Sequence, residues 1–267
     1  FFPPRVRARA LAVYSMGPYI GAGLALMIGG GAIDMIARHG TMELPLLGTL
    51  APWQQTFVLV GLPGLLIAAL FLIVREPPRH GLVKADRNAG VLKFMWARKK
   101  TFYAMIIGFS IFGIAGISYL AWIPAVLIRT HGWNASQVGF AYGAVLLLGA
   151  TPGVLGGGWL SDFLAARGRK DAPLVAAIFG LVCSIPFAIA TPLMPDANWA
   201  VASLAGFSFF AGLMNSLPAT SLQSVSPNQF RAQVTAIYFL IGNLISLAGG
   251  PTIVAAISDG LLGGPKH

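Results

Sequence analysis

Few residues in this chain of 267 have types and spacing that suggest chemistry. The four histidines and the single cysteine show no metal-binding spacing, and the sequence contains no phosphate-binding glycine loop or nucleophile arrangement. The most distinctive group is one carboxylate, Asp162, which ends the segment Gly158-Trp159-Leu160-Ser161-Asp162 and precedes Arg167, Arg169 and Lys170. Such a carboxylate can pair with a basic residue on a neighbouring helix. We expect no catalytic residue, no metal site and no cofactor, and therefore not an enzyme.

The composition indicates an integral membrane protein. Hydrophobic residues make up 56% of the chain and charged residues 10%, whereas an ordinary soluble domain is about 25% charged. Between the charged clusters lie apolar stretches, each near or above the ~20 residues that a helix needs to cross a bilayer. These seven stretches run roughly over 10–33, 56–74, 102–128, 138–160, 174–193, 199–225 and 234–257. The pattern excludes a water-soluble enzyme and predicts an all-α membrane protein with seven transmembrane helices.

The net charge of +10 indicates orientation and not nucleic-acid binding. Most basic residues lie before the first stretch, after the second and fourth, and before the seventh, which all fall on one side of the membrane. The other side has only Arg38, Arg129 and Lys266. Because cytoplasmic loops carry the excess of Lys and Arg, we expect residue 1 on the cytoplasmic side, in a bacterial inner (plasma) membrane.

A short internal repeat predicts a larger plan. The segment from Arg7 to Tyr14 recurs from Arg231 to Tyr238, and each copy opens a helix that leads from the inside to the outside. Parallel repeats of six helices are typical of one class of transporters. We therefore expect helices 5 to 11 of twelve, although a complete seven-helix protein is the alternative. The predicted parts are the end of an N-terminal half (1–74), a basic central loop (75–100) and the start of a C-terminal half (101–267).

The segment that ends at Asp162 resembles the cytoplasmic-loop signature of the major facilitator superfamily, in its second-half copy. The spacer before the basic run is slightly longer than in the family pattern. The resemblance implies a major-facilitator-type helical bundle and an ion pair between Asp162 and Arg231. With Gly158, Arg167 and Arg169, this pair would form an inside gate that is closed when the cavity faces outward. From the residues alone, Asp162 could equally end a helix near solvent.

No ionisable residue lies deep inside any of the seven stretches, so polar and aromatic side chains are the candidates for substrate contact. In the resembled fold, helices 7 and 10 line the central cavity, and any coupling residues would then lie in helices 1 to 4. Each candidate could serve helix packing instead. The candidates are Ser118, Tyr119, Trp122, Ser208 and Asn215, with Tyr14, Tyr142 and Asn243 on flanking stretches.

Three short segments resemble bacterial spinster-like proteins within the superfamily: Phe2–Tyr14, the run from Val60 to Arg79, and Tyr119–Pro124. The resemblance implies proton-coupled alternating-access transport of lipid-like amphiphiles, such as a lysophospholipid or a sphingoid phosphate. The expected partners are membrane lipids, an amphiphilic or organic-anion substrate and protons, with no nucleic acid. An organic-anion symporter or a drug/proton antiporter is the alternative. A lipid scramblase is a further alternative function, whereas a seven-helix receptor conflicts with the predicted orientation.

Overall fold

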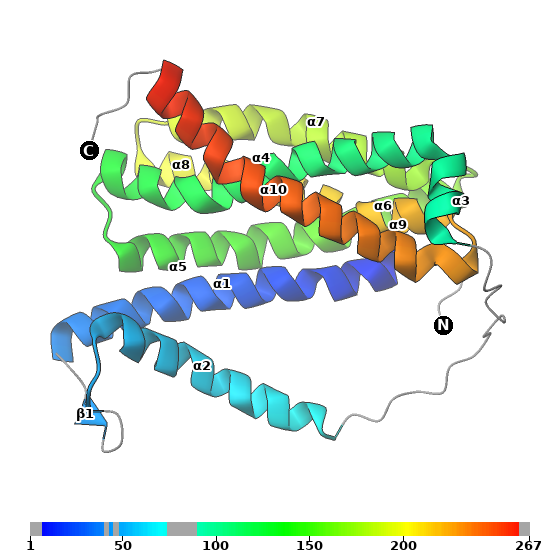
Figure 1. Cartoon of the computed structure of the whole chain (residues 1–267). Helices are drawn as coiled ribbons and strands as arrows, with labels where there is room; N and C mark the ends of the chain where they lie inside the picture. Colours follow the sequence, from blue (N-terminus) through cyan, green and yellow to red (C-terminus); the bar gives the residue numbers. More distant parts are fainter. Residues whose placement is uncertain (1–6, 40–42, 45–47, 74–89, 262–267) are drawn as a thin grey trace.

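The computed structural model describes residues 7–39, 43–44, 48–73 and 90–261, and the expectations for 1–6, 74–89 and 262–267 lie outside these described residues. The chain forms an elongated helical bundle (Figure 1). Its elements are α1 (Arg7–His39), β1 (Glu43–Leu44), β2 (Gly48–Thr49), α2 (Pro52–Phe71), α3 (Val91–Ala97), α4 (Lys99–His131), α5 (Ala135–Val145), η2 (Leu146–Ala150), α6 (Thr151–Ala166), α7 (Ala172–Leu193), α8 (Ala197–Asn215), α9 (Leu217–Val225), η3 (Asn228–Phe230) and α10 (Arg231–Leu261).

The described helices agree with the predicted all-α membrane fold. The described part of the chain contains six helical segments that are long and apolar enough to cross a membrane. The remaining apolar stretch, 56–74, falls on the 20-residue helix α2 over its described part. The span 135–166 contains α5, η2 and α6, and the span 197–225 contains α8 and α9. The sequence did not predict the antiparallel pair of β1 and β2, which lies between α1 and α2.

The helices pack so that α1 lies along α5, η2 and α6, while α10 crosses α4, and α7 lies along α8 (Figure 1). One apolar core joins α4 to α7, α9 and α10, and includes Phe102, Phe109 and Leu217. A second core joins α4 to α5 and α8, and includes Leu127 and Leu204. The outer face of α7 instead exposes apolar side chains at helical spacing, which suits contact with lipid tails. These are Ile178, Val182, Ile185 and Ile189.

Glycines let α6 approach the backbone of α8. A Cβ atom on Gly153 would lie 2.1 Å from the Phe209 carbonyl oxygen, and one on Gly157 would lie 2.1 Å from that of Leu213. Gly156 has more space, since its Cβ would lie 3.4 Å from the nearest atom. Small residues commonly permit such close approach in membrane bundles. The close approach of α6 and α8 is therefore made at Gly153 and Gly157.

The span formed by α5 and α6 is interrupted by the π-helical turn η2, directly before Pro152. Proline has no backbone N–H to donate within the helix. The Thr151 N–H donates to the Leu146 carbonyl oxygen, and the Thr151 hydroxyl donates to the same oxygen at 3.2 Å, so two donors of one residue close the π-helical turn. Turns of this type are frequent at functional sites.

The N-terminus of α5 carries a reciprocal capping box. The Gln137 N–H donates to the Asn134 Oδ1 atom at 2.7 Å, and the Asn134 N–H donates to the Gln137 Oε1 atom at 3.0 Å. We expect Asn134→Ala to lower the free energy of unfolding by about 1 kcal/mol, because an N-terminal N–H loses its acceptor. Thermal unfolding in detergent measures the change. Asn134→Asp, which keeps the acceptor, should unfold like the parent, and equal losses in both variants would contradict the capping role.

Candidate functional site

Asp162 is the buried member of an ion pair between α6 and α1, and the other member, Arg9, has a side chain that is 52% exposed. The Asp162 side chain is 5% exposed, and its Oδ2 atom lies 3.3 Å from the Nε atom of Arg9. The same oxygen accepts a hydrogen bond from the backbone N–H of Arg9 at 3.2 Å. Arg9 is the third residue of α1, where backbone N–H groups have no acceptor inside the helix and the helix dipole is positive. The carboxylate thus meets a guanidinium, a backbone donor and a helix N-terminus, which together compensate for its burial.

Arg9 is a partner that the sequence did not identify. The internal repeat indicated this region, because Arg9 lies in the first copy of the repeated segment and Arg231 lies in the second. The distinguishing information is spatial: α1 packs against α6 along its length, so the first turn of α1 reaches the end of α6 that carries Asp162.

Arg231 begins α10 and holds the turn that precedes it. Its Nε atom donates to the carbonyl oxygens of Gln223 at 3.1 Å and Ser226 at 3.2 Å, and a terminal nitrogen donates to Asn228 Oδ1 at 3.0 Å. Arg231 therefore fixes the connection between α9 and α10. Its pairing with Asp162 stays a prediction.

The other predicted gate residues lie at the same end of α6. Gly158 is buried one turn before the signature carboxylate. The guanidinium of Arg167 lies 4.2 Å from the centre of the Phe163 ring. Arg169 donates two hydrogen bonds to Asp171, at 3.1 Å and 2.9 Å, and these bonds hold the pKa of the exposed Asp171 carboxyl below its usual value. Both arginines are exposed and interact with residues of their own segment.

Tyrosines from four helices pack into the two apolar cores. Tyr142 of α5 is 3% exposed and lies in the second core, against which Tyr119 of α4 and Tyr19 of α1 also pack. Tyr238 of α10 lies in the first core. Tyr119 and Tyr142 were predicted to line the cavity. Tyr19 and Tyr238 were missed, because a tyrosine in an apolar helix can equally face lipid.

The hydroxyls of the two central tyrosines differ in their partners. The Tyr119 hydroxyl donates to the carbonyl oxygen of Ala188 on α7, and its ring stacks on Phe207 with centroids 4.1 Å apart. The Tyr142 hydroxyl makes no hydrogen bond to another residue in the described part of the chain. The two tyrosines therefore differ in that the Tyr119 hydroxyl is held by α7; their contact with a substrate stays a prediction.

Three other predicted cavity residues serve helix packing. The Ser118 hydroxyl donates to the Ile114 carbonyl oxygen of its own helix at 2.8 Å, and its Oγ atom faces Gly250 of α10. The Trp122 Nε1 atom donates to the carbonyl oxygen of Pro251 at 3.4 Å, which joins α4 to α10. Ser208 is buried, and its Cβ atom faces Gly149 of η2.

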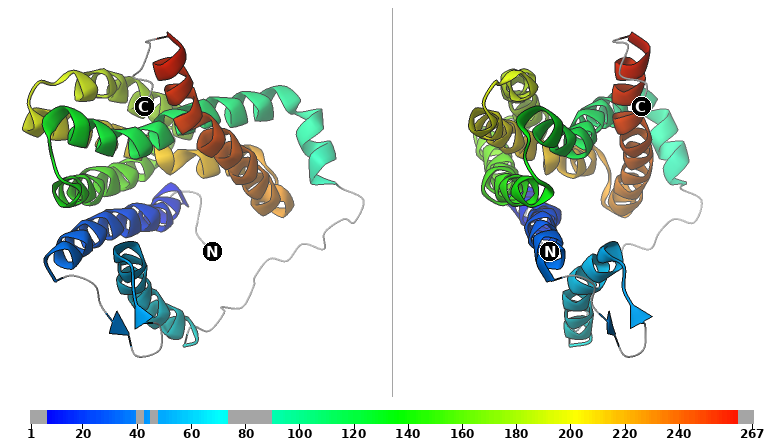
Figure 2. Two further views of the ribbon diagram at one scale, coloured as in Figure 1. Left: turned by 60° about the vertical axis from the view of Figure 1, so that its left-hand side comes forward. Right: turned by 90° about the vertical axis from the view of Figure 1, so that its left-hand side faces the viewer.

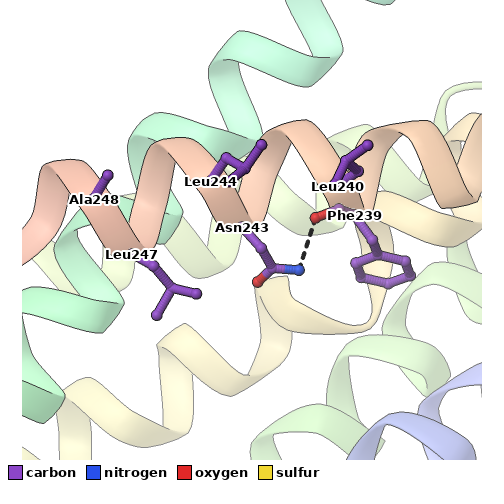
Figure 3. Close-up of a pocket in the computed structure, with 6 residues that line it drawn as sticks. All are labelled: Phe239, Leu240, Asn243, Leu244, Leu247 and Ala248. Carbon is purple, nitrogen blue, oxygen red and sulfur yellow. Dashed lines mark hydrogen bonds between the residues drawn. The ribbon is translucent and has the colours of Figure 1, made fainter.

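The remaining predicted cavity residues are exposed. Asn215 ends α8, and Tyr14 on α1 is 79% exposed. Asn243 donates from Nδ2 to the Phe239 carbonyl oxygen at 2.8 Å and lies in an open apolar groove along α10. In Figure 3, the side chains of Phe239, Asn243 and Leu247 point to the same side of the helix.

The sequence of the chain matches a known protein family. Residues 1–250 match the family described as Major Facilitator Superfamily. The chain belongs to the major facilitator superfamily. Members of the superfamily named below are transporters or an efflux pump, which confirms the prediction that the chain is not an enzyme.

Among curated members of the superfamily, the chain is similar to a probable galactarate/D-glucarate transporter, GudP, of Bacillus subtilis (26% identity; 80% of this chain and 52% of the relative). It is also similar to an MFS-type efflux pump of Mycolicibacterium smegmatis (28% identity; 97% and 57%) and to protein spinster of Drosophila melanogaster (23% identity; 98% and 42%). The chain spans about half the length of the curated relatives it matches.

A solved superfamily structure shares the fold. The crystal structure of a bacterial homologue of the human lysosomal transporter spinster, in an inward-facing and unoccupied conformation, matches with a TM-score of 0.65 and 25% identity. The match covers 98% of this chain and 58% of that one. The predicted major-facilitator-type fold and the predicted likeness to spinster proteins are both confirmed.

Proposed function

We propose that the protein is a secondary active transporter that works by alternating access, with the contact between α1 and α6 as its cytoplasmic gate. The observation that carries this proposal is the buried Asp162 carboxylate, which is held by the side chain and the backbone N–H of Arg9. Membership of the superfamily supports transport, and the position of this carboxylate in the signature segment supports a gate.

In this proposal, the gate joins the two halves of the transporter. Residues 1–74 end the first half, 75–100 connect the halves, and 101–267 begin the second. The two copies of the repeat support this division, because α1 begins at Arg7 and α10 begins at the corresponding residue, Arg231. Movement of α1 away from α6 would then separate the halves on one side.

The burial of the Asp162 carboxylate makes the closed state of the proposed gate depend on the donors around it. In the closed state, Asp162 has little contact with water, so its charge depends on Arg9 and on the N-terminus of α1. A buried carboxylate that loses its donors is costly, whereas water can replace those donors when the contact opens. The two states can therefore lie close in free energy, as alternating access requires.

The orientation follows from the distribution of charge. The starts of α1, α4 and α10 lie at the same end of the bundle in Figure 1. Lys99, Lys100 and Arg231 lie near that end, whereas Arg129 lies near the opposite end of α4. The excess of basic residues supports a cytoplasmic location for this end and for residue 1, in a bacterial plasma membrane.

For the substrate, we favour a lipid-like amphiphile such as a lysophospholipid or a sphingoid phosphate. Phenol hydroxyls donate hydrogen bonds to the oxygens of a head group, and Tyr142 carries such a hydroxyl in the core where Tyr19 of α1 also packs. The stacked rings of Tyr119 and Phe207 provide an apolar surface beside it. The similarity to spinster proteins supports this class.

The alternative substrate is a hydroxylated organic acid, which the similarity to a galactarate/D-glucarate transporter favours. The similarity to an efflux pump supports a drug as a third possibility. Uptake or counterflow in proteoliposomes with an imposed pH gradient separates the three classes. A pH-driven flux of lysophospholipid or sphingoid phosphate supports the proposal. Flux of galactarate alone would contradict the proposal of a lipid-like substrate but would still support the proposal of a transporter.

A tyrosine substitution tests the binding surface. We expect Tyr142→Phe to raise KM roughly tenfold with little change in kcat, because loss of one hydrogen bond to a charged head group costs about 1.5 kcal/mol. Concentration-dependent uptake measures both constants. Tyr14→Phe is the matched control, since Tyr14 is 79% exposed. An unchanged KM in Tyr142→Phe would show that this hydroxyl does not bind the substrate.

A further inference from the structure

The short helix α3 has a fixed position at the start of α4. The chain turns at Arg98 between these helices, so that α3 points away from the axis of α4 (Figure 2). The Phe94 ring packs between Phe102 and Phe230, with centroid distances of 5.6 Å and 5.2 Å. Met95 also packs against this core. One face of α3 is therefore anchored to the bundle.

The opposite face of α3 exposes large apolar side chains. Leu92 is 70% exposed and Trp96 is 65% exposed, and their spacing of four residues places them on one side of the helix. A leucine and a tryptophan in such positions are typical of a helix that lies at a membrane surface.

Lysines surround this apolar face. The Lys99 Nζ atom lies 5.4 Å from the centre of the Trp96 ring, and Lys93 and Lys100 are exposed nearby in the sequence. The sequence has no Asp or Glu between Asp86 and Asp162, so no acidic residue of this segment can neutralise them.

The neighbouring arginine has a different role. One terminal nitrogen of Arg98 donates to the Val225 carbonyl oxygen at 3.2 Å, and its guanidinium lies 5.2 Å from the Phe94 ring centre. Arg98 therefore holds the turn between α3 and α4 against α9. Lys93, Lys99 and Lys100 provide the exposed positive charge.

The length of α4 places these lysines at the head groups. Its 33 residues extend over about 50 Å, whereas a bilayer with its head groups is about 40–45 Å thick. The first turn of α4, with Lys99 and Lys100, therefore reaches the polar surface of the bilayer.

We propose that Leu92, Trp96, Lys93, Lys99 and Lys100 form a binding surface for the head groups of anionic phospholipids. The apolar pair enters the boundary between head groups and tails, and the three ammonium groups contact the phosphates and attract lipids with net negative charge. None of these five residues belongs to the proposed gate or to the tyrosines of the two cores.

Site-specific quenching tests this surface in the full-length protein. A fluorescent NBD probe is attached to Gly90→Cys in a Cys183→Ser background, since Gly90 precedes α3 and a Cβ atom there meets nothing within 4 Å. The protein is placed in phosphatidylcholine nanodiscs that contain a small fraction of one nitroxide-labelled lipid, which quenches the probe. In one sample this lipid is phosphatidylglycerol, and in the other it is phosphatidylcholine labelled at the same acyl carbon. We expect roughly tenfold enrichment of phosphatidylglycerol at the probe, and less at high salt.

Two variants with equal loss of charge complete the test. Lys93→Gln/Lys99→Gln/Lys100→Gln should abolish the preference for phosphatidylglycerol. The control changes Arg38, Arg129 and Lys266 to Gln and should retain the preference. Equal quenching by both lipids in the parent, or retention of the preference in the triple-lysine variant, would overturn the proposal. Quenching by neither lipid would show that another part of the protein covers this face, which would overturn it as well.

Discussion

Asp162→Asn is expected to reduce transport at least tenfold while the protein stays folded and inserted. Asparagine keeps an oxygen that can accept the Arg9 N–H, but it loses the charge that pairs with the guanidinium and the N-terminus of α1. A hydrogen bond to a charged group contributes about 1.5–3 kcal/mol, which corresponds to roughly a tenfold to hundredfold change in the population of the closed gate. Initial rates of substrate flux in proteoliposomes measure the effect.

Two further variants identify the cause of that loss. Arg9→Gln should have a smaller effect than Asp162→Asn, because the backbone donor and the helix N-terminus stay in place. Asp196→Asn is the control, since Asp196 is an exposed cap of α8 and asparagine caps a helix equally well. Equal losses in Asp162→Asn and Asp196→Asn would attribute the effect to a general change in charge. Unchanged flux in Asp162→Asn would contradict the gate.

Gly157→Ala is expected to destabilise the bundle by about 2–3 kcal/mol, and Gly153→Ala by a similar amount. Each new Cβ atom would lie 2.1 Å from a backbone carbonyl oxygen of α8, so the two helices must move apart. Thermal unfolding in detergent should show a fall in Tm of roughly 5–10 °C.

The adjacent glycine provides a matched control for this prediction. Gly156→Ala should leave Tm nearly unchanged, because its Cβ atom would meet only a Leu213 methyl group, at 3.4 Å. Equal Tm values for Gly156→Ala and Gly157→Ala would show that the close approach of α6 and α8 does not limit stability.

Much of the fold was predictable because membrane insertion leaves a strong signal in the sequence. An apolar stretch of about 20 residues is readable without tertiary information, and each of the seven predicted stretches coincides, apart from a few turn residues, with one or more helices over its described part. The short pair of β1 and β2 was not predictable, since each strand has two residues and no alternating pattern. The π-helical turn η2 was also missed, because Pro152 predicts a break in the helical ladder but not its form.

The site was less predictable, because it depends on which face each helix buries. An apolar helix has a weak amphipathic pattern, so the sequence did not distinguish the interior position of Tyr19 from the exposed position of Tyr14. Ser118 satisfies its hydroxyl on its own helix, a common alternative for small polar side chains. The pairing of Asp162 with Arg9 requires α1 to pack along α6, which no local pattern encodes.

The accessibility of Ala12 tests the gate most directly. Ala12 lies one turn after Arg9 on α1 and is 0% exposed. A single cysteine is introduced as Ala12→Cys with Cys183→Ser, and its reaction with a polar maleimide is timed in nanodiscs, where both faces of the bilayer are open. The gate predicts slow labelling with Asp162 present and at least tenfold faster labelling in Asp162→Asn. Equal labelling rates in the two proteins would contradict it.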